Sequence, residues 1–219
     1  MIPIGDVMPS RTTPWVTIGL VAANAAVFAR LLFLPDAAVN DVYLTYGLIP
    51  AQFSWPDVVT SMFVHGSGLA LATNLIALWI FGDNVEDRMG HGRFLLFYLL
   101  AGVVAALVQC RADAGGTLPL VGASGATAGV MGAYLVLFLH SRVLVLIYLV
   151  VFVDAVEVPA VFLMAIWLAF QMLGGLVYAG YEFRGDMAFS GHAVAFIAGA
   201  VTVWLFRRPE RQEVAWWNG

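Results

Sequence analysis

Six long apolar segments constrain the fold of this chain more than any other feature of its sequence. They run over about Trp15–Leu34, Val58–Phe81, Phe94–Cys110, Gly122–Leu139, Ala160–Tyr178 and Ala188–Phe206. Each has roughly the 17 to 25 residues that a helix needs to cross the hydrocarbon core of a bilayer. Only 11% of the residues are charged, against about 25% in soluble domains. We therefore expect an all-α membrane protein, with residues 1–219 forming one domain of six transmembrane helices.

The arginines favour one orientation of these helices in the membrane. An even number of spans places both termini on the same side. With the termini in the cytoplasm, the inner side carries more arginines than the outer side, as the positive-inside rule requires. The inner arginines are Arg11, Arg88, Arg93, Arg142, Arg207, Arg208 and Arg211, and the outer ones are Arg30, Arg111 and Arg184. The sequence predicts an N-in, C-in topology.

Two connecting segments are too apolar to be ordinary loops and too short to span. Residues 35–57 contain aromatic residues and prolines, and we expect them to lie at the outer interface. Residues 142–159 contain an apolar run of about 11 residues before Asp154 and Glu157, which suits an interfacial or re-entrant piece. A seventh helix here would place the C-terminal arginines outside.

Several classes of protein lack support in the sequence. A single cysteine, Cys110, excludes an intramolecular disulfide framework. The chain has no zinc-ligand spacing, no phosphate-binding glycine loop and no basic stripe for nucleic acid. We expect no metal, no cofactor and no nucleic-acid partner.

Three polar side chains interrupt the apolar segments. They are Asn74, Ser124 and His192. A polar or ionisable group at membrane depth is costly and marks a functional site by default. In the predicted topology their three helices run in the same direction and carry these residues in the outer half of the bilayer. The three groups could meet in a cavity open to outside water.

Ser124 and His192 have the chemistry of a nucleophile and its base. Ser124 opens a helix among small residues, where free N–H groups and the helix dipole would favour an oxyanion. The stripe Gly191, Ala195, Gly199 predicts close packing of the last helix, which would bring His192 beside Ser124. A serine in hydrogen-bond reach of a histidine can be deprotonated as it attacks a carbonyl. The alternatives are a helix-capping serine and a structural histidine bonded to the backbone.

The other polar residues have weaker claims. Asn74 could donate its amide to the oxyanion, or make an interhelical hydrogen bond. His65 lies near the outer end of its span, and we expect it to bond the outer loop. His91 and His140 lie on the cytoplasmic side in this topology, which excludes them from an outward-facing site.

In order along the chain, these segments resemble the rhomboid family of intramembrane serine proteases. The resemblance covers nearly the whole chain, and its pieces are specific in combination. They are PSRTTPWVT, YGLIPAQF, FVHGSGLALATN, the segment FGDNVEDRMGHGRF with Gly82, Glu86, Gly90 and Arg93, then GASGATAG, Trp167-xxx-Gln171, and His192 followed by small residues.

The resemblance implies a reaction, a substrate class and a location. Ser124 would be the nucleophile and His192 the general base, without an acidic third member. The substrate would be the transmembrane segment of another protein, cut near the outer surface of a bilayer, expected to be a prokaryotic cell membrane. Trp167, Gln171 and the loop over 179–187 would form a gate.

The chain departs from the family at the oxyanion hole. The family uses the backbone N–H of Ser124, the amide of Asn74 and a histidine four residues before that asparagine, where this chain has Ala70. Two other readings therefore stay open. One is a rhomboid-like pseudoprotease that binds membrane-protein clients without cutting them, and the other is a small transporter with His192 as proton carrier.

Overall fold

The computed structural model describes residues 2–6, 12–149, 152–178 and 189–208, which are mostly helical. The longer helices are α1 (Trp15–Leu31), α2 (Asp36–Tyr46), α4 (Gly68–Met89), α5 (His91–Ala112), α6 (Ser124–Leu137), α7 (Ala160–Tyr178) and α8 (Phe189–Phe206). Short helical turns are η1 (Pro50–Gln52), α3 (Trp55–Thr60) and η2 (Ser61–Phe63). The strands are β1 (Ile2–Asp6), β2 (Arg142–Leu149) and β3 (Phe152–Pro159).

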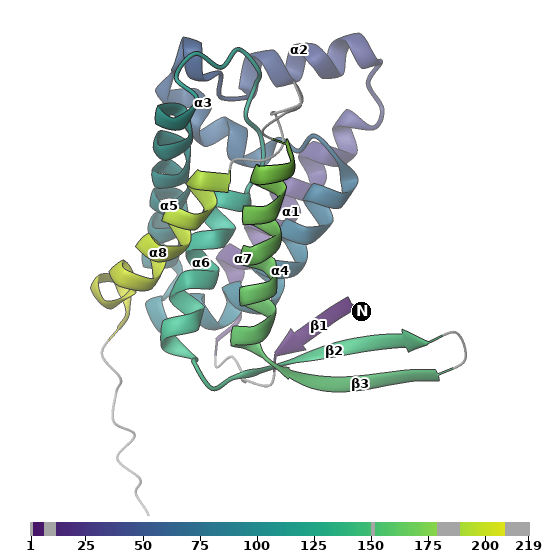
Figure 1. Ribbon diagram of the computed structural model, residues 1–219, viewed down its shortest axis with the longest axis vertical. Helices are drawn as coiled ribbons and strands as arrows, with labels where there is room; N and C mark the ends of the chain where they lie inside the picture. Colours follow the sequence, from purple (N-terminus) through teal and green to yellow (C-terminus); the bar gives the residue numbers. More distant parts are fainter. Residues whose placement is uncertain (1, 7–11, 150–151, 179–188, 209–219) are drawn as a thin grey trace, which may run out of the picture.

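The longer helices other than α2 form an upright bundle, with α2 and α3 at one end and the strands at the other (Figure 1). Two contacts show that the N-terminal strand and the residues after α8 both lie at the end of the bundle that carries the strands. Strand β1 pairs with β2, and the amide of Arg208, just after α8, donates to the carbonyl of Arg88 at the end of α4 (2.8 Å). The described N- and C-terminal parts therefore lie at the same end of the bundle.

Helix α6 lies at the centre of the bundle. It packs against α4, α5 and α8, and every residue from Gly125 to Tyr134 is buried. A helix that is apolar on all sides is buried in a protein core or in a membrane, and the packing of α6 against its neighbours shows the first of these. Its 14 residues rise about 21 Å, less than the roughly 30 Å of a hydrocarbon core. Ser124 is the first residue of this short helix.

Glycines bring α8 into backbone contact with α6. A Cβ atom added to Gly199 would collide with the carbonyl oxygen of Gly129, and one added to Gly132 would collide with that of Phe196. The predicted stripe on α8 thus meets α6 at Gly199. Gly191 faces the backbone of Ala105 on α5 instead.

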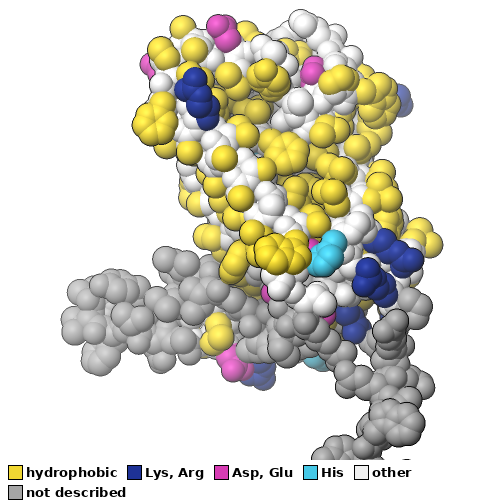
Figure 2. All heavy atoms as spheres, turned by 180° about the vertical axis from the view of Figure 1, so that it is seen from behind, with side chains coloured by type: hydrophobic (Ala, Val, Ile, Leu, Met, Phe, Trp, Pro, Cys, Tyr) yellow, Lys and Arg dark blue, Asp and Glu magenta, His cyan; other side chains and the backbone are white. Residues whose placement is uncertain are grey.

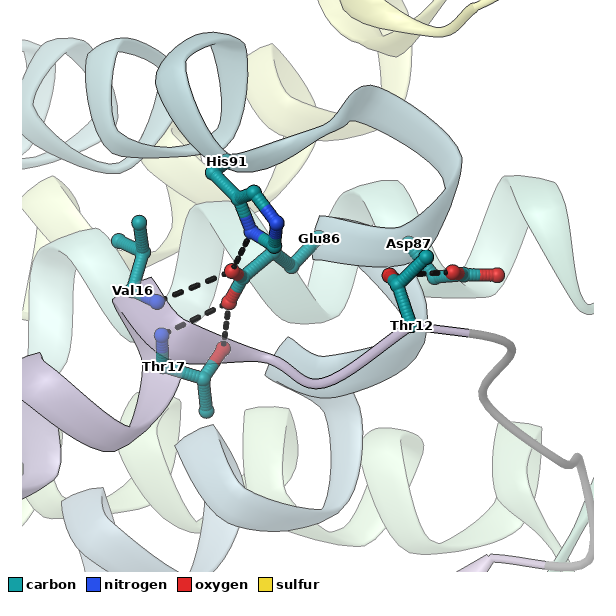
Figure 3. Close-up of polar contacts among 6 residues, drawn as sticks. All are labelled: Thr12, Val16, Thr17, Glu86, Asp87 and His91. Carbon is teal, nitrogen blue, oxygen red and sulfur yellow. Dashed lines mark hydrogen bonds and ion pairs between the residues drawn. The ribbon is translucent and has the colours of Figure 1, made fainter.

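A buried carboxylate joins α1 to α4 at the strand end of the bundle (Figure 3). Glu86 is fully buried, and its oxygens accept hydrogen bonds from the backbone N–H groups of Val16 and Thr17 (2.9 and 2.7 Å) and the Thr17 hydroxyl (2.7 Å). The ring of His91 also bonds Glu86 (2.5 Å). The N–H groups are free donors at the start of α1, and a carboxylate there is stabilised by the helix dipole.

The expectation of an all-α fold is wrong at residues 142–159. Residues 142–149 and 152–159 form the antiparallel strands β2 and β3, which join β1 in a sheet of order β1-β2-β3. The sheet projects crosswise from the bundle (Figure 1). The segment is rich in valine, which favours strands, and Val143 and Val145 point from one face of β2 into the core. Hydropathy recognised an apolar segment too short to span but did not separate a re-entrant piece from a hairpin.

The second predicted span starts later in the structure. Helix α4 begins at Gly68, with the hydroxyl of Ser67 accepting from the N–H of Ala70 (3.1 Å) as its N-cap. Residues 55–63 form α3 and η2 instead. Gly66 and Gly68 flank this N-cap, and glycine is a poor helix former.

The surface of the bundle is consistent with a lipid environment. Figure 2 shows hydrophobic side chains over the sides of the helical body and charged side chains gathered toward its two ends. Among the described residues, α4 and α5 are long and apolar enough to cross a membrane by length and composition. The other apolar helices there, including Trp15–Leu31, Ser124–Leu137 and Ser190–Phe206, are shorter.

Candidate active site

Ser124 and His192 meet between α6 and α8. The hydroxyl oxygen of Ser124 lies 2.6 Å from Nε2 of His192, and the imidazole is 2% exposed. A ring protonated on Nδ1 accepts the serine proton at Nε2 in this geometry. The contact depends on the close packing of α6 and α8, because each helix carries one member of the pair. The arrangement is that of a nucleophile and its base.

The turn before Ser124 is held by hydrogen bonds from two consecutive backbone N–H groups. The N–H of Gly122 donates to the carbonyl of Ser61 (2.9 Å), and the N–H of Ala123 donates to Nε2 of His65 (3.4 Å). Gly122 has φ +121°, a backbone conformation that side-chain-bearing residues rarely adopt. The turn therefore needs glycine at 122 to deliver Ser124 to the first position of α6.

His65 has a role that sequence reasoning missed. It lies in the loop between η2 and α4, is fully buried, and its Nε2 is 3.1 Å from the amide nitrogen of Asn74. Burial lowers the pKa of His65 to about 4, so the ring is neutral at physiological pH. We expected His65 to bond the outer loop, and its backbone carbonyl accepts from the hydroxyl of Tyr43 there (3.4 Å). Its ring, in addition, joins Asn74 to the turn before Ser124. The one available signal was its position nine residues before Asn74, which does not by itself predict contact.

A cavity opens beside the serine and the histidine. Its lining includes Ser124, His192, Ser61, Gly102, Gln109 and Leu120. The hydroxyl of Ser190 on α8 donates to Oε1 of Gln109 on α5 (2.9 Å). The lining therefore combines small residues with polar side chains next to the Ser124 hydroxyl.

The remaining predicted site residues are placed differently. The ring of Trp167 on α7 lies beside that of His192, with centroids 6.2 Å apart. The side chain of Gln171 and the loop over 179–187 lie outside the described part of the structure. Ala70 is on the first turn of α4, one turn before Asn74, and carries no group that could donate to an oxyanion.

Comparison with known protein families matches the sequence of this chain to one family. The family model described as the Rhomboid domain matches residues 52–209. That range contains Asn74, Ser124 and His192, and it confirms the resemblance seen in the sequence. The family is one of integral membrane proteins.

The individual relatives come from a bacterium and from two eukaryotic organelles. The chain is 39% identical to "Rhomboid protease GluP" of Bacillus subtilis over 92 residues, 42% of this chain and 18% of that protein. It is 28% identical to "Rhomboid-like protein 11, chloroplastic" of Arabidopsis thaliana over 192 residues, 86% of this chain and 64% of that protein. It is 28% identical to the mouse "Presenilin-associated rhomboid-like protein, mitochondrial" over 195 residues, 87% of this chain and 50% of that protein.

The matches cover only part of each relative, and the relatives differ in location. The chain spans less than two thirds of the length of each of the three proteins. Chloroplastic and mitochondrial relatives stand beside the bacterial one, so the comparisons do not support the narrower expectation of a prokaryotic cell membrane.

Proposed function

Because the chain belongs to the rhomboid family, we propose that it is an intramembrane serine endopeptidase that cuts transmembrane segments of other proteins. Ser124 is the nucleophile and His192 the general base. The observation that carries this proposal is the distance of 2.6 Å between the Ser124 hydroxyl and Nε2 of His192. At least one relative, the Bacillus subtilis protein, carries the name of a protease.

The proposed chemistry uses the two side chains in turn. As the Ser124 hydroxyl attacks a substrate carbonyl, its proton passes to Nε2 of His192. The oxyanion receives hydrogen bonds from the backbone N–H of Ser124 and the amide of Asn74. His192 then gives its proton to the leaving amine, which leaves an acyl group on Ser124. A water molecule, deprotonated by His192, releases that group as a carboxylic acid.

The proposed topology has six membrane-spanning helices, α1 and α4 to α8, with both termini in the cytoplasm. The shared position of β1, the end of α4 and the end of α8 supports a common side for the termini. Ser124 then lies toward the outer half of the membrane, at the start of the short helix α6. Trp167, beside His192, and Gln171 stand on the helix that we propose as the gate for the substrate.

One observation favours a second candidate function. Ala70 removes a donor that the family's oxyanion hole is expected to contain. Losing one such donor costs about 10²–10³ in rate where nothing replaces it. A chain with this loss could bind membrane-protein clients without cutting them. The presence of both Ser124 and His192 at hydrogen-bond distance favours the protease.

Cleavage of a tagged single-span substrate in proteoliposomes separates the two functions. The unmodified chain is expected to release a fragment, whereas Ser124→Ala and His192→Ala are expected to leave the substrate intact. Exposed Thr73→Ala on α4 is a control that should retain cleavage. Binding of the substrate without a fragment from any of these chains would establish the non-cutting function instead.

A further inference from the structure

The segment over residues 61–65 holds both groups that would stabilise an oxyanion. Its carbonyl at Ser61 accepts from the N–H of Gly122 (2.9 Å), and its imidazole at His65 accepts from the N–H of Ala123 (3.4 Å). These are the two residues before Ser124. The segment therefore fixes the backbone from which the Ser124 N–H projects.

The same imidazole fixes the side chain of Asn74. Its Nε2 lies 3.1 Å from Nδ2 of Asn74, and both neighbours of Nε2 are N–H donors. The nitrogen must be unprotonated, with its lone pair shared between the amide of Asn74 and the backbone of Ala123. An asparagine amide has two N–H groups, so one can bond His65 while the other stays available for a substrate oxygen.

Burial makes this contact rigid. His65 is fully buried and Asn74 is 7% exposed, so water does not compete well for either group. Ordinarily an amide could rotate to several orientations, but an unprotonated nitrogen accepts only from the NH2 side of Asn74. The imidazole thus selects the orientation of the Asn74 amide in which its NH2 group, and not its carbonyl oxygen, faces Nε2 of His65.

We propose that His65 is a positioning residue for oxyanion stabilisation, holding the Asn74 amide and the turn before Ser124 in one fixed geometry. The inference rests on the proposed protease function. It bears most strongly on this chain because Ala70 supplies no donor of its own, so more of the stabilisation falls on the two groups that His65 orients. His65 itself touches no reacting atom.

A double-mutant cycle in kcat tests this role. At metal sites, partners that orient a ligand typically change activity about 10- to 100-fold when removed, and we take that as the scale for His65. We expect His65→Leu to lower kcat by about that factor with KM changed little, and Asn74→Ala to lower kcat as well. In the Asn74→Ala background, His65→Leu should cost less than in the unmodified chain, because one of the two groups that it orients is gone. Equal costs in both backgrounds would overturn the proposal.

Two further variants separate the positioning role from a general loss of folding. The side-chain oxygen of His65→Gln can reach the place of Nε2 and accept the same two hydrogen bonds, whereas His65→Asn is too short to do so. We expect the glutamine variant to recover most of kcat and the asparagine variant to recover little, with similar melting temperatures. Activity that follows the melting temperature across all variants, with no advantage for glutamine, would make His65 a merely structural residue.

The outcome is distinguishable from failure of the proposed function. If the unmodified chain makes no Ser124-dependent fragment, the protease function fails first. If it makes the fragment and the cycle shows no coupling between positions 65 and 74, the protease stands and the positioning role falls.

Discussion

The hydroxyl of Ser124 lies 2.6 Å from Nε2 of His192, although the residues are 68 positions apart in the chain. Each stands near the start of a helix, α6 or α8. The pair therefore exists only while these two helices stay in register. The backbone contact of Gly199 with Gly129 is one feature that sets this register.

Gly199→Ala is expected to lower both stability and activity. The new methyl group would meet the carbonyl oxygen of Gly129, and overpacking of this kind typically costs about 1–3 kcal/mol. Displacement of α8 would also move His192 away from Ser124. Thermal unfolding in detergent and the rate of substrate cleavage measure the two effects.

Gly19→Ala is the matched control for that substitution. Gly19 also lies inside a helix, but no atom lies within 4 Å of an added Cβ. Alanine there should raise helix stability by about 0.5–1 kcal/mol and leave cleavage unchanged. If both variants behave alike, close contact between α6 and α8 does not set the geometry of the site.

Ala70→His is expected to raise the cleavage rate. Residues four apart share a helix face, so the new imidazole would stand beside Asn74 and could donate to the oxyanion. One added donor can supply up to about 10²-fold in kcat. Ala72→His places the same side chain on an exposed part of α4 and should have no such effect. An unchanged or lower kcat for Ala70→His would show that this chain builds its oxyanion hole without that position.

Glu86→Ala is expected to destabilise the bundle at its strand end. The substitution leaves the buried N–H groups of Val16 and Thr17 without their acceptor. Such a loss typically costs about 1–3 kcal/mol for each buried group. Asp87→Ala, which removes one exposed hydrogen bond to Thr12, should cost much less. Equal shifts of the melting temperature for the two variants would contradict the role of Glu86 as the cap of α1.

Single introduced cysteines test the proposed topology. In a Cys110→Ser background, Thr117→Cys lies in the connection between α5 and α6, and Gly92→Cys lies at the opposite end of α5; both positions are exposed. A membrane-impermeant maleimide should label Thr117→Cys in intact cells and Gly92→Cys only after the cells are opened. The reverse pattern would invert the orientation, and labelling of both in intact cells would remove the proposed span at α5.

The sequence predicted the part of the site that depends on helix packing. Small residues on α8 indicated a close helix contact, and that contact brings His192 to Ser124. It did not predict the role of His65, because the bond from Ala123 to His65 joins residues 58 positions apart through irregular loops. Hydrophobic periodicity carries no information about how two loops meet.

The sheet was missed for a related physical reason. Strand β1 pairs with β2 some 140 positions later, for example Ile2 with Leu146, and such long-range pairing leaves no local pattern. Hydropathy also placed the start of the second span near Val58, since it averages over the apolar turns α3 and η2. The helix begins at Gly68, where Ser67 provides the N-cap.

Labelling with a fluorophosphonate probe in a native membrane tests the central claim most directly. The account predicts that the unmodified chain forms a covalent adduct at Ser124, that Ser124→Ala forms none, and that His192→Ala reacts far more slowly because its serine lacks a base. No adduct on the unmodified chain, or an adduct that persists in Ser124→Ala, would contradict the assignment of Ser124 as the nucleophile.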